Sequence, residues 1–268
     1  MPQRDDPRIR IRSLDPAQPW QWVRKGWEDF RRVPLIGALH GLAVAAFGFV
    51  LLLVARDQFW LLAGAFSGFM VVAPVVAVGL YAVSRALERG EPAGLGLVLR
   101  TWWSWRGKPH HDWRLVRFGL LLGLSATGWV ITSAALITLL APEPVRQPMD
   151  FLRHVVLARD NYLFEFWLML GGLLAAPVFA STVITLPLLL DRKVDILPAV
   201  LASWRVVVQN PVPMAVWAGL IMLLTALAML GFVMGCAVLL PVLGHASWHA
   251  YRDAVDASAL PPRVPGES

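Results

Sequence analysis

The chain has 268 residues, of which 57% are apolar and only 16% are charged. Soluble domains carry about a quarter charged residues, so this composition excludes an ordinary soluble domain and indicates an integral membrane protein. A net charge of +6 could suggest nucleic acid in a soluble protein, but here we assign it to basic loops on one membrane face and expect no nucleic-acid partner.

The N-terminal residues 1–34 are polar and mix arginine with aspartate. They lack the apolar run and the small-residue cleavage site of a secretory signal peptide, so we expect a retained cytoplasmic N-terminal segment. Residues 35–255 are assigned to one transmembrane domain. The polar residues 256–268 are expected to form a flexible C-terminal tail.

Four apolar runs are each long enough to cross the hydrocarbon core, which takes about 20 residues. They predict spans at about residues 35–54, 59–83, 115–140 and 162–190. A last run, 212–243, is ambiguous, because its 32 residues would form one helix of about 48 Å. As two helices, it must turn near Gly231.

An internal repeat favours two helices. A glycine lies six residues before a proline in three apolar helices, at Gly68/Pro74, Gly171/Pro177 and Gly235/Pro241. In the first two copies this helix is the second span of a hairpin. The third copy then predicts spans at 212–230 and 232–251. The expected fold is an all-α membrane protein with six transmembrane helices arranged as three hairpin repeats.

Basic residues are distributed unequally between the loops of this arrangement. The two short outer loops hold four of the 24 Lys and Arg residues, and the other 20 lie on the inner side. Lys and Arg concentrate on the cytoplasmic side of membrane proteins, so both termini are predicted to be cytoplasmic. We expect a multi-pass protein of the bacterial inner (plasma) membrane, surrounded by the lipid bilayer.

Two stretches after the second and fourth spans place apolar and aromatic residues at helical spacing beside arginines. They are marked by Leu95, Leu99, Trp102 and Trp103, and by Ile196, Val200, Trp204 and Val207. Tryptophan is favoured at the headgroup level. The pattern predicts short cytoplasmic interfacial helices, with loops that carry scattered aromatics as the alternative.

Three segments combine glycine, aromatic and charged residues: Gly26-Trp27-Glu28-Asp29-Phe30, Gly79-Leu80-Tyr81 with Ser84-Arg85 and Glu88-Arg89-Gly90-Glu91, and Gly244-His245-Ala246-Ser247-Trp248-His249-Ala250-Tyr251-Arg252-Asp253. Together they resemble a proteobacterial family of integral membrane proteins, the domain of unknown function 2189. The likeness extends over nearly the whole chain, and the last segment is its most specific part. The resemblance implies a membrane topology and assigns no activity.

Two histidines near the end of the last span, His245 and His249, are four residues apart and share one helix face. Such a pair can hold a metal ion or supply an axial haem ligand, with His40 in the first span as a third contributor. Anchoring by hydrogen bonds at the cytoplasmic edge is the simpler interpretation, and a proton or ion path is another. We expect no cofactor and keep haem or metal at His245 and His249 as the alternative.

Six further candidate positions lie near the ends of the second and sixth spans: Tyr81, Arg85, Glu88, Trp248, Tyr251 and Arg252. Arg85 and Glu88 have the spacing of an i,i+3 ion pair, although an arginine that extends to the headgroups would explain the same pattern. No nucleotide-binding, zinc-peptidase or nucleophile-elbow motif occurs. We therefore expect no enzymatic activity and assign no catalytic residue.

Three functions remain open at this point. The first is a non-enzymatic scaffold or assembly partner of other membrane proteins. The second is a small transporter or channel, because prolines interrupt several spans and repeated broken helices can mark a transport site. The third is a haem- or metal-binding membrane protein.

Overall fold

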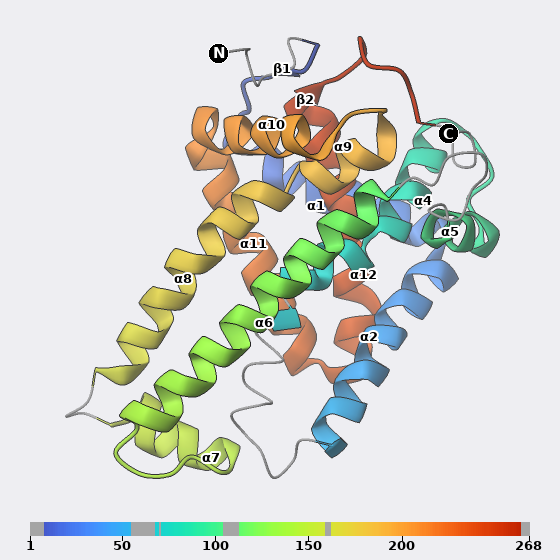
Figure 1. The fold of residues 1–268 in the computed structure, drawn as a ribbon. Helices are drawn as coiled ribbons and strands as arrows, with labels where there is room; N and C mark the ends of the chain where they lie inside the picture. The colour runs from blue at the N-terminus through green and yellow to red at the C-terminus, as the bar shows by residue number, and fades with distance from the viewer. Residues whose placement is uncertain (1–7, 55–67, 70, 104–112, 159–161, 264–268) are drawn as a thin grey trace. The chain divides into compact units, whose positions relative to one another are not determined.

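The computed structural model describes the chain except for residues 1–7, 55–67, 70, 104–112, 159–161 and 264–268. It is built of helices with one short pair of strands, as expected for an all-α membrane protein (Figure 1). The elements are β1 (Arg10–Ile11), α1 (Gln18–Arg32), α2 (Pro34–Val54), α4 (Val78–Glu88), α5 (Leu95–Trp102), α6 (Arg114–Leu140), α7 (Pro148–Phe151), the π-helical turn η2 (Leu152–Val156), α8 (Leu163–Thr182), α9 (Thr185–Asp191), α10 (Ile196–Gln209), α11 (Pro211–Leu230), α12 (Phe232–Ala254) and β2 (Val255–Asp256).

Five helical runs within the described residues are long and apolar enough to cross a membrane. They are Pro34–Val54, Arg114–Leu140, Leu163–Asp191, Pro211–Leu230 and Val233–Ala254. The chain is thus a multi-pass integral membrane protein. Residues 59–67 and 70 of the predicted second span, 59–83, lie outside the described residues, and the described part is helical over 71–76 before a turn at Ala77 leads into α4.

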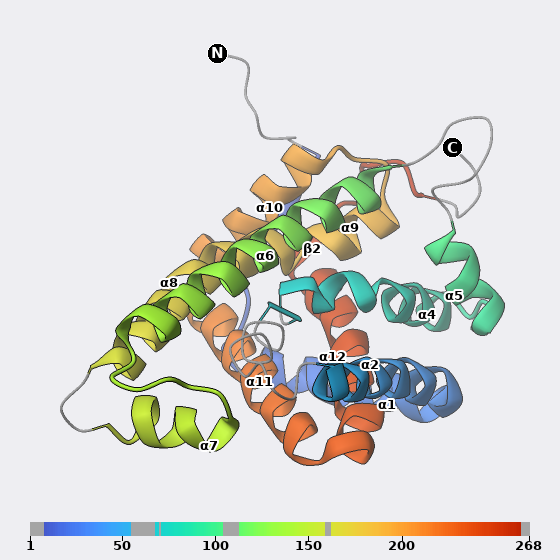
Figure 2. The ribbon, with the colours of Figure 1, turned by 60° about the horizontal axis from the view of Figure 1, so that its bottom comes forward.

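The last apolar run forms two helices, α11 and α12, as the sequence predicted. The turn lies at Gly231, where the chain reverses into a hairpin (Figure 2). A Cβ at Gly235 would collide with the backbone of Ala228, so glycine at this position lets the two helices approach closely.

A break at Val183 and Ile184 divides the predicted fourth span into α8 and α9. Pro187 has no N–H, so the carbonyl of Val183 lacks its usual helical partner. At the same break, the N–H of Ile184 donates to the Ser203 hydroxyl of α10, at 3.2 Å. The contact to α10 stabilises the break.

The described chain divides into two compact units, 1–45 with 74–118 and 180–268, and 46–73 with 119–179. In the second unit α6 and α8 run side by side (Figures 1 and 2). Gly171 lets the ring of Trp129 pack against the backbone of α8, and the indole N–H of Trp167 donates to the Ser133 hydroxyl at 2.8 Å. Small residues and one indole–hydroxyl bond therefore join these helices.

In the first unit, the N-terminal segment packs against the last helix. Trp22 of α1 is fully buried, and a Cβ at Gly26 would lie 2.5 Å from the carbonyl oxygen of Val242 in α12. Figure 2 shows α1 alongside α12. The segment expected only as a cytoplasmic extension is therefore part of the helix packing.

The expected flexible tail also differs from the structure. Asp256 in β2 pairs with Arg10 in β1, so the two ends of the described chain lie together beside α10 (Figure 1). Leu260 is 1% exposed, and the N–H of Arg263 donates to the Asp191 carbonyl at 2.8 Å. Backbone pairing and burial hold the chain as far as residue 263, which a polar sequence does not indicate.

The two stretches predicted as interfacial helices are helical, as α5 and α10. Their exposed faces are apolar, with Leu99 and Trp102 on α5 and Leu197 and Trp204 on α10 all at least 39% exposed. Apolar faces of this kind suit the boundary between lipid headgroups and acyl chains. Their place at the membrane surface stays a prediction.

Candidate functional site

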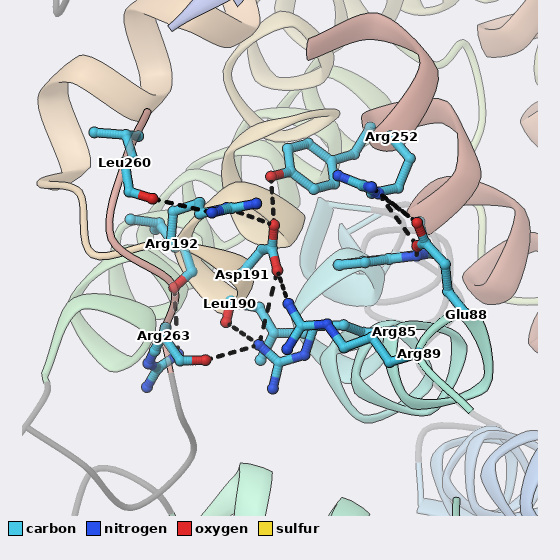
Figure 3. A network of polar contacts seen from close by, with 12 residues as sticks. Arg85, Glu88, Arg89, Leu190, Asp191, Arg192, Arg252, Leu260 and Arg263 are labelled. Atoms are coloured by element: carbon cyan, nitrogen blue, oxygen red, sulfur yellow. Dashed lines mark hydrogen bonds and ion pairs between the residues drawn. The ribbon is translucent and has the colours of Figure 1, made fainter. Parts of the chain in front are cut away.

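The carboxylate of Asp191, at the end of α9, is the centre of a buried polar network and only 1% exposed. It accepts hydrogen bonds from the Tyr251 hydroxyl at 2.9 Å, from Arg89 at 3.0 Å and from Arg192 at 3.0 Å. The guanidinium of Arg85 lies 4.0 Å away. Figure 3 shows these side chains converging from α4, α9 and α12. One buried carboxylate is therefore surrounded by several cations.

The surrounding arginines also bond to the last carbonyls of α9. Arg85 donates to the carbonyls of Leu190 and Arg263, at 2.9 and 3.1 Å, and Arg263 donates to the carbonyl of Leu189 at 3.3 Å. The final carbonyls of a helix have no intrahelical partner and carry partial negative charge. The two arginines thus stabilise the end of α9 and attach the C-terminal segment to it.

A second carboxylate, Glu88 at the end of α4, joins α4 to α12. It accepts the indole N–H of Trp248 at 2.9 Å and an N–H of Arg252 at 2.9 Å. The i,i+3 spacing suggested a pair between Arg85 and Glu88. The structure gives each a partner on another element, because α9 and α12 both pack against α4.

A further group of polar side chains joins α1 to α12. Asp253 accepts the indole N–H of Trp22 at 2.9 Å and lies 3.3 Å from the ammonium of Lys25. Asp29 is 2.8 Å from Nε2 of His249. These contacts use residues of the N-terminal segment that the candidate positions of the sequence did not include.

Asp29 is ionised at neutral pH because of its partners. Burial by itself raises the pKa of this carboxyl, but hydrogen bonds with His249 and Ser84 outweigh burial and hold the pKa below its ordinary value of 3.8. The charges of His249 and His245 act in the same direction. Asp29 is therefore an acceptor only, and its neighbours must donate to it.

The histidines predicted to share a helix face bond to different groups. Nδ1 of His245 lies 2.8 Å from the Ser84 hydroxyl, whereas Nε2 of His249 faces Asp29. His40 donates from Nδ1 to the carbonyl of Ile36 at 2.9 Å. Within the described part of the chain, no group of three or more His, Cys, Asp or Glu side chains is placed to hold a metal ion.

The structure brings most of the sequence-derived candidates together. Arg85 and Tyr251 meet at Asp191, Trp248 and Arg252 meet at Glu88, and Tyr81 is buried at 3% exposure. The sequence candidates missed several members of the network: Asp29, Ser84, Arg89, Asp191, Arg192, Asp253 and Arg263. One signal was present, because Asp191 falls on Glu88 at the repeat offset of 103 residues.

Comparison with known proteins agrees with this architecture. The model of a family described as predicted integral membrane protein, domain of unknown function 2189, matches residues 61–191. Residues 61–191 are therefore similar to this family. The match confirms the resemblance for that segment, which includes Glu88 and Asp191. No curated protein and no solved structure matches the chain.

Proposed function

We propose that this chain is a non-enzymatic scaffold or assembly partner for other membrane proteins. The supporting observation is the network at Asp191 and Glu88, in which the candidate polar side chains bond to one another across α4, α9 and α12. Separating a buried ion pair leaves uncompensated charge, which is strongly unfavourable. A network of this kind favours one arrangement of the helices, which suits a protein that holds others in place.

The apolar surface supports the same proposal. Only 17% of the most apolar 18-residue stretch of α2 is buried within the chain. Most of that helix is therefore open to lipid or to a partner. Large side chains such as Phe47, Phe49 and Val54 are more than half exposed. In a membrane, apolar helix faces associate through packing and small residues, so these faces can contact other proteins.

Affinity purification of the tagged chain from native membranes, with identification of co-purifying proteins, tests the proposal. We expect the same membrane proteins to co-purify in stoichiometric amounts. Asp191→Asn should lose them because it loosens the network, and Asp256→Asn, at an exposed ion pair, should retain them. Recovery of no membrane protein above an untagged control would contradict the scaffold function.

A small transporter or channel is the second candidate, and the break between α8 and α9 favours it. Hydroxyl groups gather there, because Thr185 bonds to carbonyls of Ser181 and Ala199. A transport path would admit water to this region and toward His40. In a Cys236→Ala background, Thr182→Cys should then react with a membrane-impermeant thiol reagent. Protection of that cysteine would favour the scaffold.

Haem or metal at His245 and His249 is the third candidate. The absorption spectrum and metal content of the purified protein decide it. If the protein is a scaffold, we expect no Soret band and no stoichiometric metal. Either signal would favour haem or metal binding over the scaffold function.

We further propose six spans in three hairpins, with both termini on the cytoplasmic side of the bacterial inner membrane. The pairing of Arg10 with Asp256 supports an even number of crossings, because paired strands lie on one side of a bilayer. Five described runs then require one more, which the region 59–83 supplies. Reporters fused at each terminus should both be active in the cytoplasm, and an external C-terminal reporter would mean five spans.

A further inference from the structure

The last turn of α1 carries two exposed arginines, Arg31 and Arg32. Neither guanidinium forms a hydrogen bond or an ion pair with any other residue that the structure describes. The two carboxylates of the same helix are already engaged, because Glu28 lies 3.8 Å from Arg24 and Asp29 faces His249. The end of α1 therefore presents two positive charges without a counterion.

These arginines lie where the chain enters a membrane span. Helix α1 ends at Arg32 and the span α2 begins at Pro34, so only Val33 separates them. Lys and Arg side chains at the end of a span extend to the headgroup level, where anionic lipids attract them. The position of Arg31 and Arg32 thus brings both guanidinium groups within reach of lipid phosphates.

Helix α5 adds a third charge beside the same entry point. Ile36 in the first turn of α2 and Val98 of α5 belong to one buried apolar cluster, which holds α5 beside the start of the span. Arg100 of α5 is exposed, and it also has no hydrogen bond or ion pair within the described part of the chain. Helix α5 contains no acidic residue. Two elements distant in sequence therefore place unpaired arginines around the start of α2.

Exposed apolar and aromatic side chains accompany these charges. Trp27 on α1 and Trp103 after α5 are 44% and 52% exposed, and Leu35 and Leu99 are exposed beside them in sequence. Tryptophan is favoured at the headgroup level, and leucine is suited to the acyl chains below it. A soluble anion would account for the arginines but would leave these side chains in water. The combination favours a phospholipid as the ligand.

We propose that the end of α1 and helix α5 bind the phosphate groups of anionic phospholipids where α2 enters the bilayer. Arg31, Arg32 and Arg100 are the phosphate ligands, since a guanidinium can donate two parallel hydrogen bonds to phosphate. Trp27 and Trp103 lie beside the headgroups. A zwitterionic lipid also has a phosphate, but its own ammonium group compensates that charge. The surface therefore prefers lipids with a net negative charge.

Native mass spectrometry of the full-length protein in detergent tests this assignment by measuring apparent dissociation constants for added lipids. Phosphatidylglycerol is the anionic probe and phosphatidylcholine is the zwitterionic one. The wild-type protein should bind phosphatidylglycerol more tightly. Each basic residue near an anionic surface contributes about fivefold, so combined Arg31→Gln, Arg32→Gln and Arg100→Gln should weaken phosphatidylglycerol binding on the order of 100-fold. Binding of phosphatidylcholine should change much less.

Two matched triple variants serve as controls. The combination of Arg10→Gln, Arg146→Gln and Arg153→Gln removes the same charge from exposed positions outside α1, α2 and α5, and should keep the preference for phosphatidylglycerol. Lysine at positions 31, 32 and 100 should also keep it, because an ammonium group binds phosphate as a point charge. Excess inorganic phosphate should not displace the bound lipid.

Four outcomes would overturn the proposal. They are equal wild-type affinities for the two lipids, an unchanged preference in the α1 and α5 triple variant, an equal loss in the control that removes the same charge, and displacement by inorganic phosphate. The last outcome would indicate a site for soluble anions. Should the triple variant fail to fold, the single Arg→Gln variants, each expected to weaken binding about fivefold, decide the question.

Discussion

At the scale of single residues, Asp191 determines how the buried charges of this protein are arranged. Its carboxylate is the shared acceptor for Arg89, Arg192 and Tyr251, and it lies within ion-pair distance of Arg85. A lone buried arginine would be unfavourable, and the carboxylate offsets that cost. Asp191 is thus important because its negative charge compensates the positive charge of the arginines around it.

Asp191→Asn should strongly destabilise the protein, because it leaves buried guanidinium groups without their counterion. Removal of one partner of a buried ion pair typically costs about 3–5 kcal/mol. The measurement is thermal unfolding of the purified protein in detergent. As a control, Asp256→Asn breaks an exposed pair with Arg12 and should cost no more than about 1 kcal/mol. Equal melting temperatures for the two variants would contradict the assigned role.

Asp29 should make the stability of the protein dependent on pH in the acid range. Its pKa is lower in the folded chain than the ordinary 3.8, so its contribution is fully present above that value. The contribution is lost as the pH falls through the lowered pKa. Melting temperatures measured between pH 7 and pH 3 should therefore fall more steeply for the wild type than for Asp29→Asn. If the melting temperatures of the two proteins fall equally with pH, the contacts of Asp29 with His249 and Ser84 do not stabilise the fold.

At the scale of elements, the prolines show how one residue type has different effects in different helices. Pro177 lies inside α8 and Pro241 inside α12, and neither ends its helix. Pro187 follows a break in the helix, and there the hydroxyl of Ser203 on α10 accepts a hydrogen bond from the backbone N–H of Ile184. A proline therefore interrupts a span here only where a neighbouring helix accommodates the break.

The contact of α1 with α12 depends on a glycine, so Gly26→Ala should weaken it. A Cβ there would lie 2.5 Å from the carbonyl of Val242 and 2.8 Å from the N of Ala246, and overpacking of this kind costs about 1–3 kcal/mol. Gly219→Ala in α11 is the control, because nothing lies within 4 Å of its added Cβ. Thermal unfolding should show a loss for Gly26→Ala and no loss for Gly219→Ala. If Gly26→Ala leaves the melting temperature unchanged, α1 does not pack closely against α12 at this position.

At the scale of the whole molecule, contacts between distant parts of the sequence close the first unit. The two ends pair through β1 and β2, and His249 bonds to Asp29 across 220 residues. Because the ends are paired, the topology of the membrane domain and the position of the termini depend on each other.

Cysteines at the paired positions Ile11 and Val255 should form a disulfide in a Cys236→Ala background. Facing residues of antiparallel strands have Cα atoms about 4.5–5.5 Å apart, within the range that a disulfide spans. Mild oxidation should change the gel mobility of the double variant, and reductant should restore it. The Ile11→Cys and Val255→Cys single variants should show no such change. If the double variant fails to cross-link, the two ends of the chain are not paired as β1 and β2.

Length and hydropathy alone were enough to place the spans α2 and α6, because the cost of leaving an apolar run in water is a local property of the sequence. The last apolar run was ambiguous by length, and the repeated spacing of glycine and proline was needed to divide it into α11 and α12. The helices α5 and α10 also followed from local spacing. The partners of the polar side chains did not, because i,i+3 and i,i+4 spacing reports only on neighbours within one helix. Glu88 bonds to Arg252 and Asp29 bonds to His249 only after helix packing brings them together, and the same packing holds the C-terminal segment through Arg263.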